Sequence, residues 1–234
     1  MALDFKRFTI LTFDCYGTLI DWERGILAAV RPLLERHGVA RSDDAILELF
    51  GELEAAAEAG AYRTYREVLA LVADGCGQRL GFTPTAHERA AFAGSVGQWP
   101  AFPDTVAALH ALARHYQLAI LSNIDDDLFA ASATRLQTTF AAVITAQQVG
   151  SYKPNPRNFQ HAIARLDRPR EQILHVAQSR FHDIAPANTA GLATVWVNRR
   201  HDQPGCGATP PTSATPDLEV PDLATLARLV EEAR

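Results

Sequence analysis

The chain carries short apolar runs separated by longer segments in which apolar residues recur at helical spacing. The short runs are rich in β-branched and aliphatic residues and show little alternation of apolar and polar positions. Such runs are typical of parallel strands that are covered on both faces. They span residues 8–13, 118–122, 142–145, 173–177 and 193–197. This pattern predicts a parallel sheet built from these segments.

Helical patterns lie between the predicted strands. Residues 104–112 carry apolar side chains at helical spacing, and Asn155 followed by Pro156 has the sequence of a helix start. The apolar face of this second helix comprises Phe159, Ile163 and Leu166. Strands that alternate with helices predict an α/β fold with a doubly wound, Rossmann-like parallel sheet. In such folds, ligands bind at the carboxyl ends of the strands.

One connection is far longer than the others. The segment between the first and second predicted strands is too long for one crossover. Residues 21–100 are rich in alanine and leucine, so we expect a helical cap domain inserted into a core domain of residues 1–20 and 101–234. The predicted cap helices are residues 26–37, 43–59 and 62–73. A loop over residues 203–216, a last strand and a helix over residues 222–233 should complete the core.

Composition narrows the class of protein. The chain has 234 residues, of which 47% are hydrophobic and 21% charged, as in well-packed globular proteins. A net charge of −5 without a block of like charges argues against a nucleic-acid partner. The 3 cysteines are scattered and form no C-x-x-C pair, which is typical of reduced thiols in a cytoplasmic protein. We expect no membrane span, because no apolar run is long enough.

Polar side chains follow several predicted strands. Because the carboxyl ends of parallel strands meet at one crevice, we expect these side chains to form a site. They are Asp14, Ser122 with Asn123, Lys153, and the segment from Gln178 to Asp183. An ionised carboxylate at an open strand end can attack carbon or phosphorus, and a nearby ammonium group would favour its charged form. The Thr18 hydroxyl group could donate to this carboxylate. Taken alone, Asp14 could be a helix cap and Lys153 a solvated surface residue.

Four short motifs resemble those of a known family. FDCYGTL, LSN, YKP and AQSRFHD, the last a degraded form of GDSxxxxD, are similar to the signature of the haloacid dehalogenase-like hydrolases. The resemblance spans the whole chain, cap included. It implies that Asp14 is the nucleophile, that Ser122 is the hydroxyl residue of the second motif, and that Lys153 is the lysine of the third.

The second residue after Asp14 distinguishes branches of this family. Phosphatases of the family usually have an aspartate there as acid and base, whereas this chain has Tyr16. A phenol with an ordinary pKa near ~10 is a poor substitute for a carboxyl group near neutral pH. The chain thus resembles the (S)-2-haloacid dehalogenase branch, which characteristically has a tyrosine there because halide leaves without a proton. Tyr16 could also simply fill space beneath the cap.

The fourth motif favours the same branch. Its first acidic position is occupied by Gln178, so only Asp14 and Asp183 remain as carboxylates. Because Mg²⁺ prefers carboxylate and phosphate oxygens, a neutral amide in place of one of them weakens a magnesium site by roughly several kcal/mol. We therefore predict neither a metal nor another cofactor, with Mg²⁺ as the alternative if the protein is a phosphatase.

The known dehalogenases carry a cap arginine that faces the leaving halide. Gly51 falls near that position here, so the charge would have to come from Arg63, Arg66 or Arg24 on another turn. For each of these arginines, a solvated surface position is the simpler interpretation. The remaining predicted contacts of substrate or halide are Tyr16, Asn123, Gln178, Ser179 and Phe181.

These inferences predict a hydrolase that converts small 2-haloacids through an ester on Asp14. The substrate carboxylate would bind Ser122, and water oriented by Asp183 and Lys153 would hydrolyse the ester. The partners would be a small carboxylate substrate and halide, and a homodimer is among the assemblies that the resemblance allows. Two alternatives stay open. One is a hydrolase with the same fold acting on a phosphoester or another activated carbon, and the other is a non-catalytic binding protein.

Other conspicuous residues have structural interpretations. His175 is predicted to be a hydrogen-bonded core histidine, and Trp22 and Trp99 to pack near the ends of the cap. His182 is predicted to cap the helix that follows it. The aspartates at 125–127 are predicted to cap the helix after Asn123, where the helix dipole favours negative charge.

Overall fold

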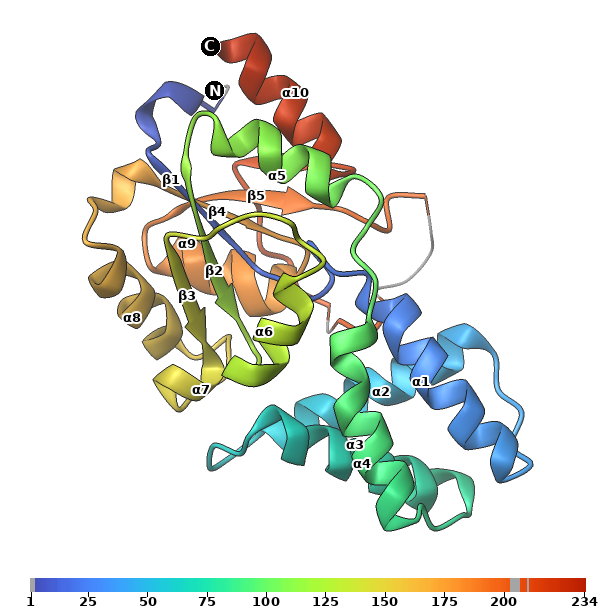
Figure 1. Ribbon diagram of the computed structural model, residues 1–234. Coiled ribbons are helices and arrows are strands. Elements are labelled where there is room, and N and C mark those ends of the chain that lie inside the picture. Colours follow the sequence, from blue (N-terminus) through green and yellow to red (C-terminus); the bar gives the residue numbers. More distant parts are fainter. Residues whose placement is uncertain (1–2, 203–206, 210) are drawn as a thin grey trace.

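The computed structural model describes residues 3–202, 207–209 and 211–234. Its centre is a six-stranded parallel sheet with strand order β3-β2-β1-β4-β5-β6 (Figure 1). The strands are β1 (Ile10–Phe13), β2 (Gln117–Ser122), β3 (Ala142–Thr145), β4 (Ile173–Ala177), β5 (Ala193–Val197) and β6 (Leu218–Val220). The predicted α/β fold is therefore confirmed. Part of the predicted 203–216 loop lies outside the described residues.

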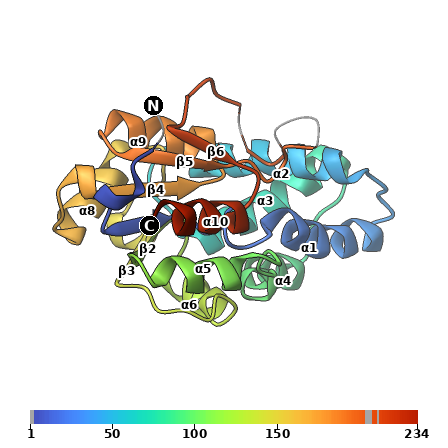
Figure 2. The same cartoon turned by 90° about the horizontal axis from the view of Figure 1, so that it is seen from above.

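Alternate residues of the strands face two separate apolar layers. In β2, Leu118 and Ile120 belong to a cluster that includes α5 (Thr105–Ala113) and α10 (Leu223–Ala233). Ala119 and Leu121 belong to a second cluster with α8 (Pro156–Leu166) and α9 (Ala185–Thr189). Helices thus cover both faces of the sheet, as Figure 2 shows from above. This arrangement explains why the strands are apolar throughout rather than alternating.

The remaining core elements lie in the connections. Two short helices, α6 (Asp126–Ala133) and α7 (Ala146–Val149), follow β2 and β3. A single π-helical turn, η4 (Arg180–Ile184), follows β4 and contains Asp183. The start of α8 is as predicted, because Asn155 accepts a hydrogen bond from the backbone N–H of Arg157 and Pro156 is the first helical residue.

The segment between β1 and α5 forms a helical insert. Its helices are α1 (Trp22–Arg36), α2 (Asp43–Glu58), α3 (Tyr65–Leu80) and α4 (Ala86–Gly94), followed by the 3₁₀ turn η2 (Ser95–Gln98). Figure 1 shows them grouped beyond one end of the core, away from both termini. The sequence pattern missed α4, although Thr85 and Glu88 form a capping box at its start. Among the described residues, no helix is long and apolar enough to cross a membrane.

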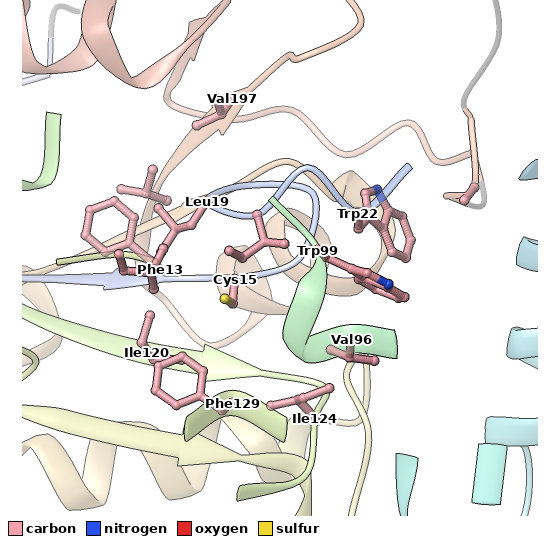
Figure 3. Close-up of a cluster of buried hydrophobic side chains, with 14 of the residues drawn as sticks. Phe13, Cys15, Leu19, Trp22, Val96, Trp99, Ile120, Ile124, Phe129 and Val197 are labelled. Carbon is pink, nitrogen blue, oxygen red and sulfur yellow. The ribbon is translucent and has the colours of Figure 1, made fainter. Parts of the chain in front are cut away.

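The two ends of the insert lie side by side. Ile20 forms an isolated bridge with Ala101, and the backbone N–H of Asp21 donates to the carbonyl of Pro100 at 2.8 Å. The predicted domain boundaries fall at these two backbone contacts. The division into two domains stays a prediction. Trp99 belongs to the same buried cluster as Phe13 and Cys15 (Figure 3). A Cβ atom at Gly25 would lie 2.2 Å from the Trp99 ring, so only glycine fits there.

Candidate active site

Asp14 follows β1 directly and begins a tight turn. Within this turn, Gly17 has a φ of +93°, a backbone conformation that favours glycine. A Cβ atom there would also lie 3.0 Å from Nε1 of Trp22 and 3.2 Å from Oε1 of Gln178. The turn returns Thr18 toward the carboxylate of Asp14. The sequence D-C-Y-G-T therefore places a carboxylate and a hydroxyl group together at the open end of the central strand.

The Asp14 carboxylate is held at both oxygens. Thr18 Oγ1 donates to Oδ2 at 2.7 Å, and Lys153 Nζ donates to Oδ1 at 3.0 Å. The same ammonium group donates to Oδ1 of Asp183 at 2.6 Å and to the carbonyl of Leu121 at 2.9 Å. With its side chain only 2% exposed, Lys153 is a buried cation between two carboxylates. The solvated interpretation of Lys153 is therefore excluded.

The electrostatics of this cluster follow from burial and pairing. Burial raises the pKa of Asp14, while Lys153 and Thr18 act in the opposite direction. For Lys153 the balance is reversed: burial lowers its pKa, but the charges of Asp14 and Asp183 raise it above the ordinary value. The pKa of Asp183 is lowered, because Lys153 and a hydrogen bond from His175 outweigh burial. The ammonium group therefore stays charged, and Asp183 is the more acidic carboxyl group.

Asp183 also contacts His175, a fully buried residue of β4. Its Nε2 is 3.0 Å from Oδ1 of Asp183, and its Nδ1 is 2.9 Å from the hydroxyl group of Thr12. Both ring nitrogens therefore have partners, as predicted for a core histidine. Through Asp183, the same side chain also supports the cluster around Lys153.

A small pocket of about 40 Å³ opens beside these groups. Its lining residues come from the core and from the insert. From the core they are Asp14, Tyr16, Ser122, Asn123, Lys153, Gln178, Ser179, His182, Asp183 and Thr209. From α1, α2 and α3 they are Trp22, Glu54 and Tyr65. The structure therefore brings together eight predicted site residues, with Thr18 bonded to Asp14 directly behind them.

Several predicted residues have specific roles in the pocket wall. The side chain of Asn123 accepts the Lys153 N–H at 2.7 Å and donates to the Lys153 carbonyl at 3.0 Å, so it positions the lysine backbone. Oε1 of Gln178 accepts a hydrogen bond from Thr209 at 3.3 Å. Ser122 Oγ is buried and has no hydrogen-bond partner among the described residues. It therefore remains available to a ligand in the pocket.

Tyr16 lines the pocket, but its hydroxyl group is hydrogen-bonded to a residue other than Asp14. It lies 2.9 Å from the hydroxyl group of Ser132, and its ring packs edge-on against Trp99 at 5.9 Å. Burial raises the pKa of Tyr16 well above its ordinary value. A phenol that is so weakly acidic and hydrogen-bonded elsewhere does not act as the acid–base group for Asp14 near neutral pH.

The structure places the candidate arginines and Phe181 outside the described pocket lining. Arg66 is exposed and pairs with Asp127 at 2.6 Å, and Arg63 is exposed and 3.4 Å from the carbonyl of Ala57. Arg24 is also exposed, and Phe181 packs edge-on against the His182 ring at 4.9 Å. Arg24 and Arg66 lie at exposed positions of α1 and α3, as helical phase dictates, whereas Arg63 lies in the loop before α3.

Gly51 cannot be replaced by a larger residue without a backbone shift. A Cβ atom there would lie 2.6 Å from the carbonyl oxygen of Ala208. The segment that contains Ala208 also supplies Thr209 to the pocket. This chain has thus brought a core loop against α2 at the position where the family resemblance implies an arginine.

The sequence pattern did not indicate that Glu54 and Tyr65 line the pocket. The buried positions of α2 are Ile46, Leu47, Phe50, Gly51 and Glu54. A glutamate on the apolar stripe of an amphipathic helix was therefore a signal in the sequence, since such residues are rarely buried without a reason. Tyr65 could not have been found, because a tyrosine in a buried helix position is ordinary.

The capping predictions hold only in part. Asp126 and Asp127 lie in the first turn of α6 as predicted, whereas Asp125 and His182 do not cap the expected helices. Asp125 stands at the start of α6, but its side chain makes no capping bond there. It accepts instead the backbone N–H groups of Tyr65 at 2.9 Å and Arg66 at 3.1 Å, and so caps α3. His182 lies inside η4, where Ser179 accepts its N–H at 2.9 Å, and the following helix α9 has no side-chain capping bond. The free N–H groups at the start of α3 thus use an acceptor from a distant segment, whereas those at the start of η4 use the local hydroxyl group of Ser179.

The donor set does not fit a resident magnesium ion. Among the described residues, no group of three or more His, Cys, Asp and Glu side chains is arranged to hold a metal. Asp14 and Asp183 share the ammonium group of Lys153, which supplies the positive charge between them. The amide oxygen of Gln178, at the first acidic position of the fourth motif, is engaged by Thr209.

Fold and site together define the class of α/β enzymes with a capped pocket at the carboxyl end of the sheet. A family model described as haloacid dehalogenase-like hydrolase matches residues 8–191. The chain belongs to this family of hydrolases.

Individual relatives differ in activity. A curated (S)-2-haloacid dehalogenase of Pseudomonas sp. (strain CBS-3) is 25% identical over 80% of this chain and 83% of its own. A pyrimidine 5'-nucleotidase of Escherichia coli (strain K12) is 31% identical over 50% of this chain and 54% of its own. The structure of an L-2-haloacid dehalogenase from Xanthobacter autotrophicus with chloropropionic acid covalently bound has a TM-score of 0.80 at 23% identity. This match covers 96% of this chain and 98% of that chain. At this identity the structural likeness shows the fold.

Proposed function

We propose that the protein hydrolyses the carbon–halogen bond of small 2-haloacids through an ester on Asp14. The observation that carries this proposal is the environment of Asp14. Lys153 and Thr18 hold its carboxylate, while the hydroxyl group of Tyr16 is bonded to Ser132. A leaving group that needs no proton suits this arrangement better than an alkoxide does. The similarity to the Pseudomonas dehalogenase over most of both chains also supports it.

The first step is displacement at C2 of the substrate. An oxygen of Asp14 attacks C2, the carbon–halogen bond breaks, and halide leaves with the bonding electrons. The substrate carboxylate would accept a hydrogen bond from Ser122 Oγ, whose hydrogen-bonding capacity is unused in the protein. The pocket is small and the insert supplies part of its wall, so the nucleophile has little contact with bulk water.

The second step is hydrolysis of the ester. Water attacks the carbonyl carbon of the Asp14 ester and the ester bond breaks. The departing oxygen takes one proton of this water and leaves as 2-hydroxyacid, and the second proton is released as the Asp14 carboxylate is regenerated. Asp183 lines the pocket and is the more acidic carboxylate of the cluster, so it can orient this water while Lys153 stabilises the charge that develops on the ester oxygen. Burial lowers the pKa of His182 to about 4, so a neutral imidazole also faces the pocket.

The direct test is halide release from (S)-2-chloropropionate and (S)-2-bromopropionate in the presence of a chelator. We expect release by the wild type, loss of release in Asp14→Asn, and no effect of the chelator. In single turnover in ¹⁸O-labelled water, the label should enter the Asp14 side chain before it enters the product. Label that enters the product first would exclude the ester.

A second candidate is a magnesium-dependent phosphatase, favoured by the identity to the nucleotidase over half of the chain. A panel of phosphate monoesters with and without Mg²⁺ separates the two. Phosphate release that depends on Mg²⁺, without any halide release, would replace the first proposal by the second.

A further inference from the structure

The insert contributes a carboxyl group to the pocket wall. Glu54 lies on α2, its side chain is almost fully buried, and it lines the same pocket as Asp14. The Tyr65 hydroxyl group of α3 is hydrogen-bonded to Oε1 of Glu54. The other oxygen, Oε2, has no hydrogen-bond partner among the described residues. Glu54 therefore has one oxygen fixed by the protein and one available to a ligand.

The carboxyl group of Glu54 lacks a counter-ion within the described part of the chain. Among the described residues, neither an arginine, a lysine nor a histidine forms an ion pair with Glu54. Burial raises the pKa of Glu54 to about 7 and outweighs the hydrogen bond from Tyr65, which acts in the opposite direction. Burial and the charge of Glu54 also raise the pKa of Glu58, one helical turn away, well above its ordinary value. A buried carboxyl group without a counter-ion is neutral over much of the working pH range.

The charges around Glu54 strengthen this conclusion. On its own helix it faces Glu58, and on α3 it faces Tyr65. The titratable groups of the core that line the same pocket are Asp14, Tyr16, Lys153, His182 and Asp183. With both aspartates ionised and only Lys153 positive, the core side of the pocket is already net negative. An anionic substrate adds to this charge, so its binding would favour the protonated form of Glu54.

The geometry of displacement defines where the leaving group goes. Backside attack sends it away from the nucleophile, and Asp14 attacks from the core side. On the insert side, the pocket is lined by Trp22, Glu54 and Tyr65. The Tyr65 hydroxyl group is already used in its bond to Glu54. The indole N–H of Trp22 and a protonated Glu54 are the two groups on this side that can donate to an incoming negative charge, and of these two only Glu54 loses its donor as the pH rises.

We propose that the protonated carboxyl group of Glu54 donates a hydrogen bond to the leaving group as Asp14 displaces it. This inference rests on the proposed function. The carbon–halogen electrons leave with the halide, the proton stays on Glu54, and the ester forms on Asp14. The carboxyl group thus takes the place of a cation at the leaving-group position. A hydrogen bond to a charged partner is worth roughly 1.5–3 kcal/mol, which corresponds to about a 10- to 100-fold effect on rate.

Binding of bromide without any substrate tests this inference independently of catalysis. Calorimetric titration of the wild type from about pH 5.5 to about pH 8.5 should show affinity that falls up to tenfold per pH unit above about 7. Glu54→Gln keeps an N–H donor and should bind bromide with little pH dependence. Glu54→Ala should bind weakly throughout. Glu52→Gln is the matched control, because Glu52 is exposed on the same helix and should leave the wild-type profile unchanged.

The outcomes separate this inference from the proposed function. Wild-type bromide affinity that is independent of pH, or equal in Glu54→Ala, would overturn it. Methylammonium binding that tightens above pH ~7 would also overturn the inference. Ionised Glu54 would then bind a cation instead of donating a hydrogen bond to an anion. If bromide binds as expected but no 2-haloacid releases halide, only the proposed function fails. If halide is released with the same pH profile in Glu54→Gln as in the wild type, only the role of Glu54 fails.

Discussion

The carboxylate of Asp125 accepts the backbone N–H of Tyr65 at 2.9 Å, and this bond joins the core to the helical insert. Asp125 belongs to the loop after β2, next to Ser122 and Asn123 of the site, whereas Tyr65 begins α3. A second bond from Asp125 to the N–H of Arg66 completes the cap of α3. The side chain that closes the start of this helix therefore also fixes Tyr65, and with it Glu54, against the pocket.

Replacement of Asp125 should affect both stability and substrate binding. We expect Asp125→Ala to lower the free energy of unfolding by about 1–2 kcal/mol, because two helix N–H groups lose their acceptor. Since the insert is then held less firmly over the pocket, KM should rise more than kcat falls. Urea unfolding and steady-state kinetics measure these effects. Ser42→Ala, which removes the cap of α2 at a site remote from Asp125, should cost a similar stability without changing KM.

Removal of the Tyr16 hydroxyl group should be tolerated. Tyr16→Phe loses one hydrogen bond, to Ser132, which is worth about 1 kcal/mol of stability. Because this hydroxyl group is not bonded to Asp14, we expect kcat to fall less than about tenfold. A fall of about 100-fold or more, with stability unchanged, would instead show that the phenol takes part in proton transfer. Halide release and urea unfolding provide the two measurements.

The hydroxyl group of Thr18 should make a large contribution to activity. Its hydroxyl group donates to Asp14 at 2.7 Å and accepts the backbone N–H of Gln178 at 2.9 Å. Thr18→Val keeps the shape but loses both bonds, one of them to a charged group worth roughly 1.5–3 kcal/mol. We expect kcat/KM to fall about 10- to 100-fold, whereas Thr18→Ser should stay close to the wild type. Equal activities of the valine and serine variants would contradict this role.

The ammonium group of Lys153 should set the acid limb of the pH profile. Asp14 attacks only when ionised, and Lys153 opposes the rise of its pKa that burial causes. In Lys153→Met the pKa of Asp14 should rise further, so ester formation at a given pH falls and is partly restored as pH increases. Rapid-quench measurement of the ester across pH shows this shift.

Stability provides an independent check on Lys153. Its loss leaves Asp14 and Asp183 buried without a counter-ion, which should cost roughly 3–5 kcal/mol of unfolding free energy. The double variant Lys153→Met/Asp183→Asn removes one of these charges and should recover part of the loss. No recovery would mean that packing, and not charge, explains the destabilisation.

Arg199 should be a structural residue that acts at a distance from the pocket. It forms two 2.9 Å bonds to Asp104 and donates to the carbonyl of Thr18 at 2.8 Å, with only 9% of its side chain exposed. Arg199→Leu should cost about 3 kcal/mol in urea unfolding, because the largely buried carboxylate of Asp104 loses its charged partner. The control is Arg228→Ala, whose exposed pair with Glu232 should contribute less than about 0.5 kcal/mol. Similar losses in both variants would contradict this difference.

The sequence predicted the core well because its signals are short-range. Five apolar runs became β1 to β5, and Asn155-Pro156 begins α8 as its capping pattern indicates. The motif residues Asp14, Ser122 and Lys153 also lie together, since the ends of neighbouring parallel strands must meet. Strand order, in contrast, could not be derived from these patterns alone.

The insert was predicted less well, because helix phase and packing decide which side chains reach the pocket. Arg63 and Arg66 carry the charge that the resemblance requires, yet both lie on exposed positions of the structure. Glu54 carries the opposite charge and lines the pocket. One step along a helix turns a side chain to another face, so composition and spacing do not determine which residue faces Asp14.

The amino-acid sequence by itself determined the sheet, the helical insert and the residues at the strand ends, because each depends on local periodicity or on a fixed spacing. Only the tertiary structure decided that Asp125 caps α3 and that Glu54 faces the pocket. Both depend on contacts between segments far apart in the chain, and hydrogen bonds and burial at such contacts are set by packing and not by neighbouring residues.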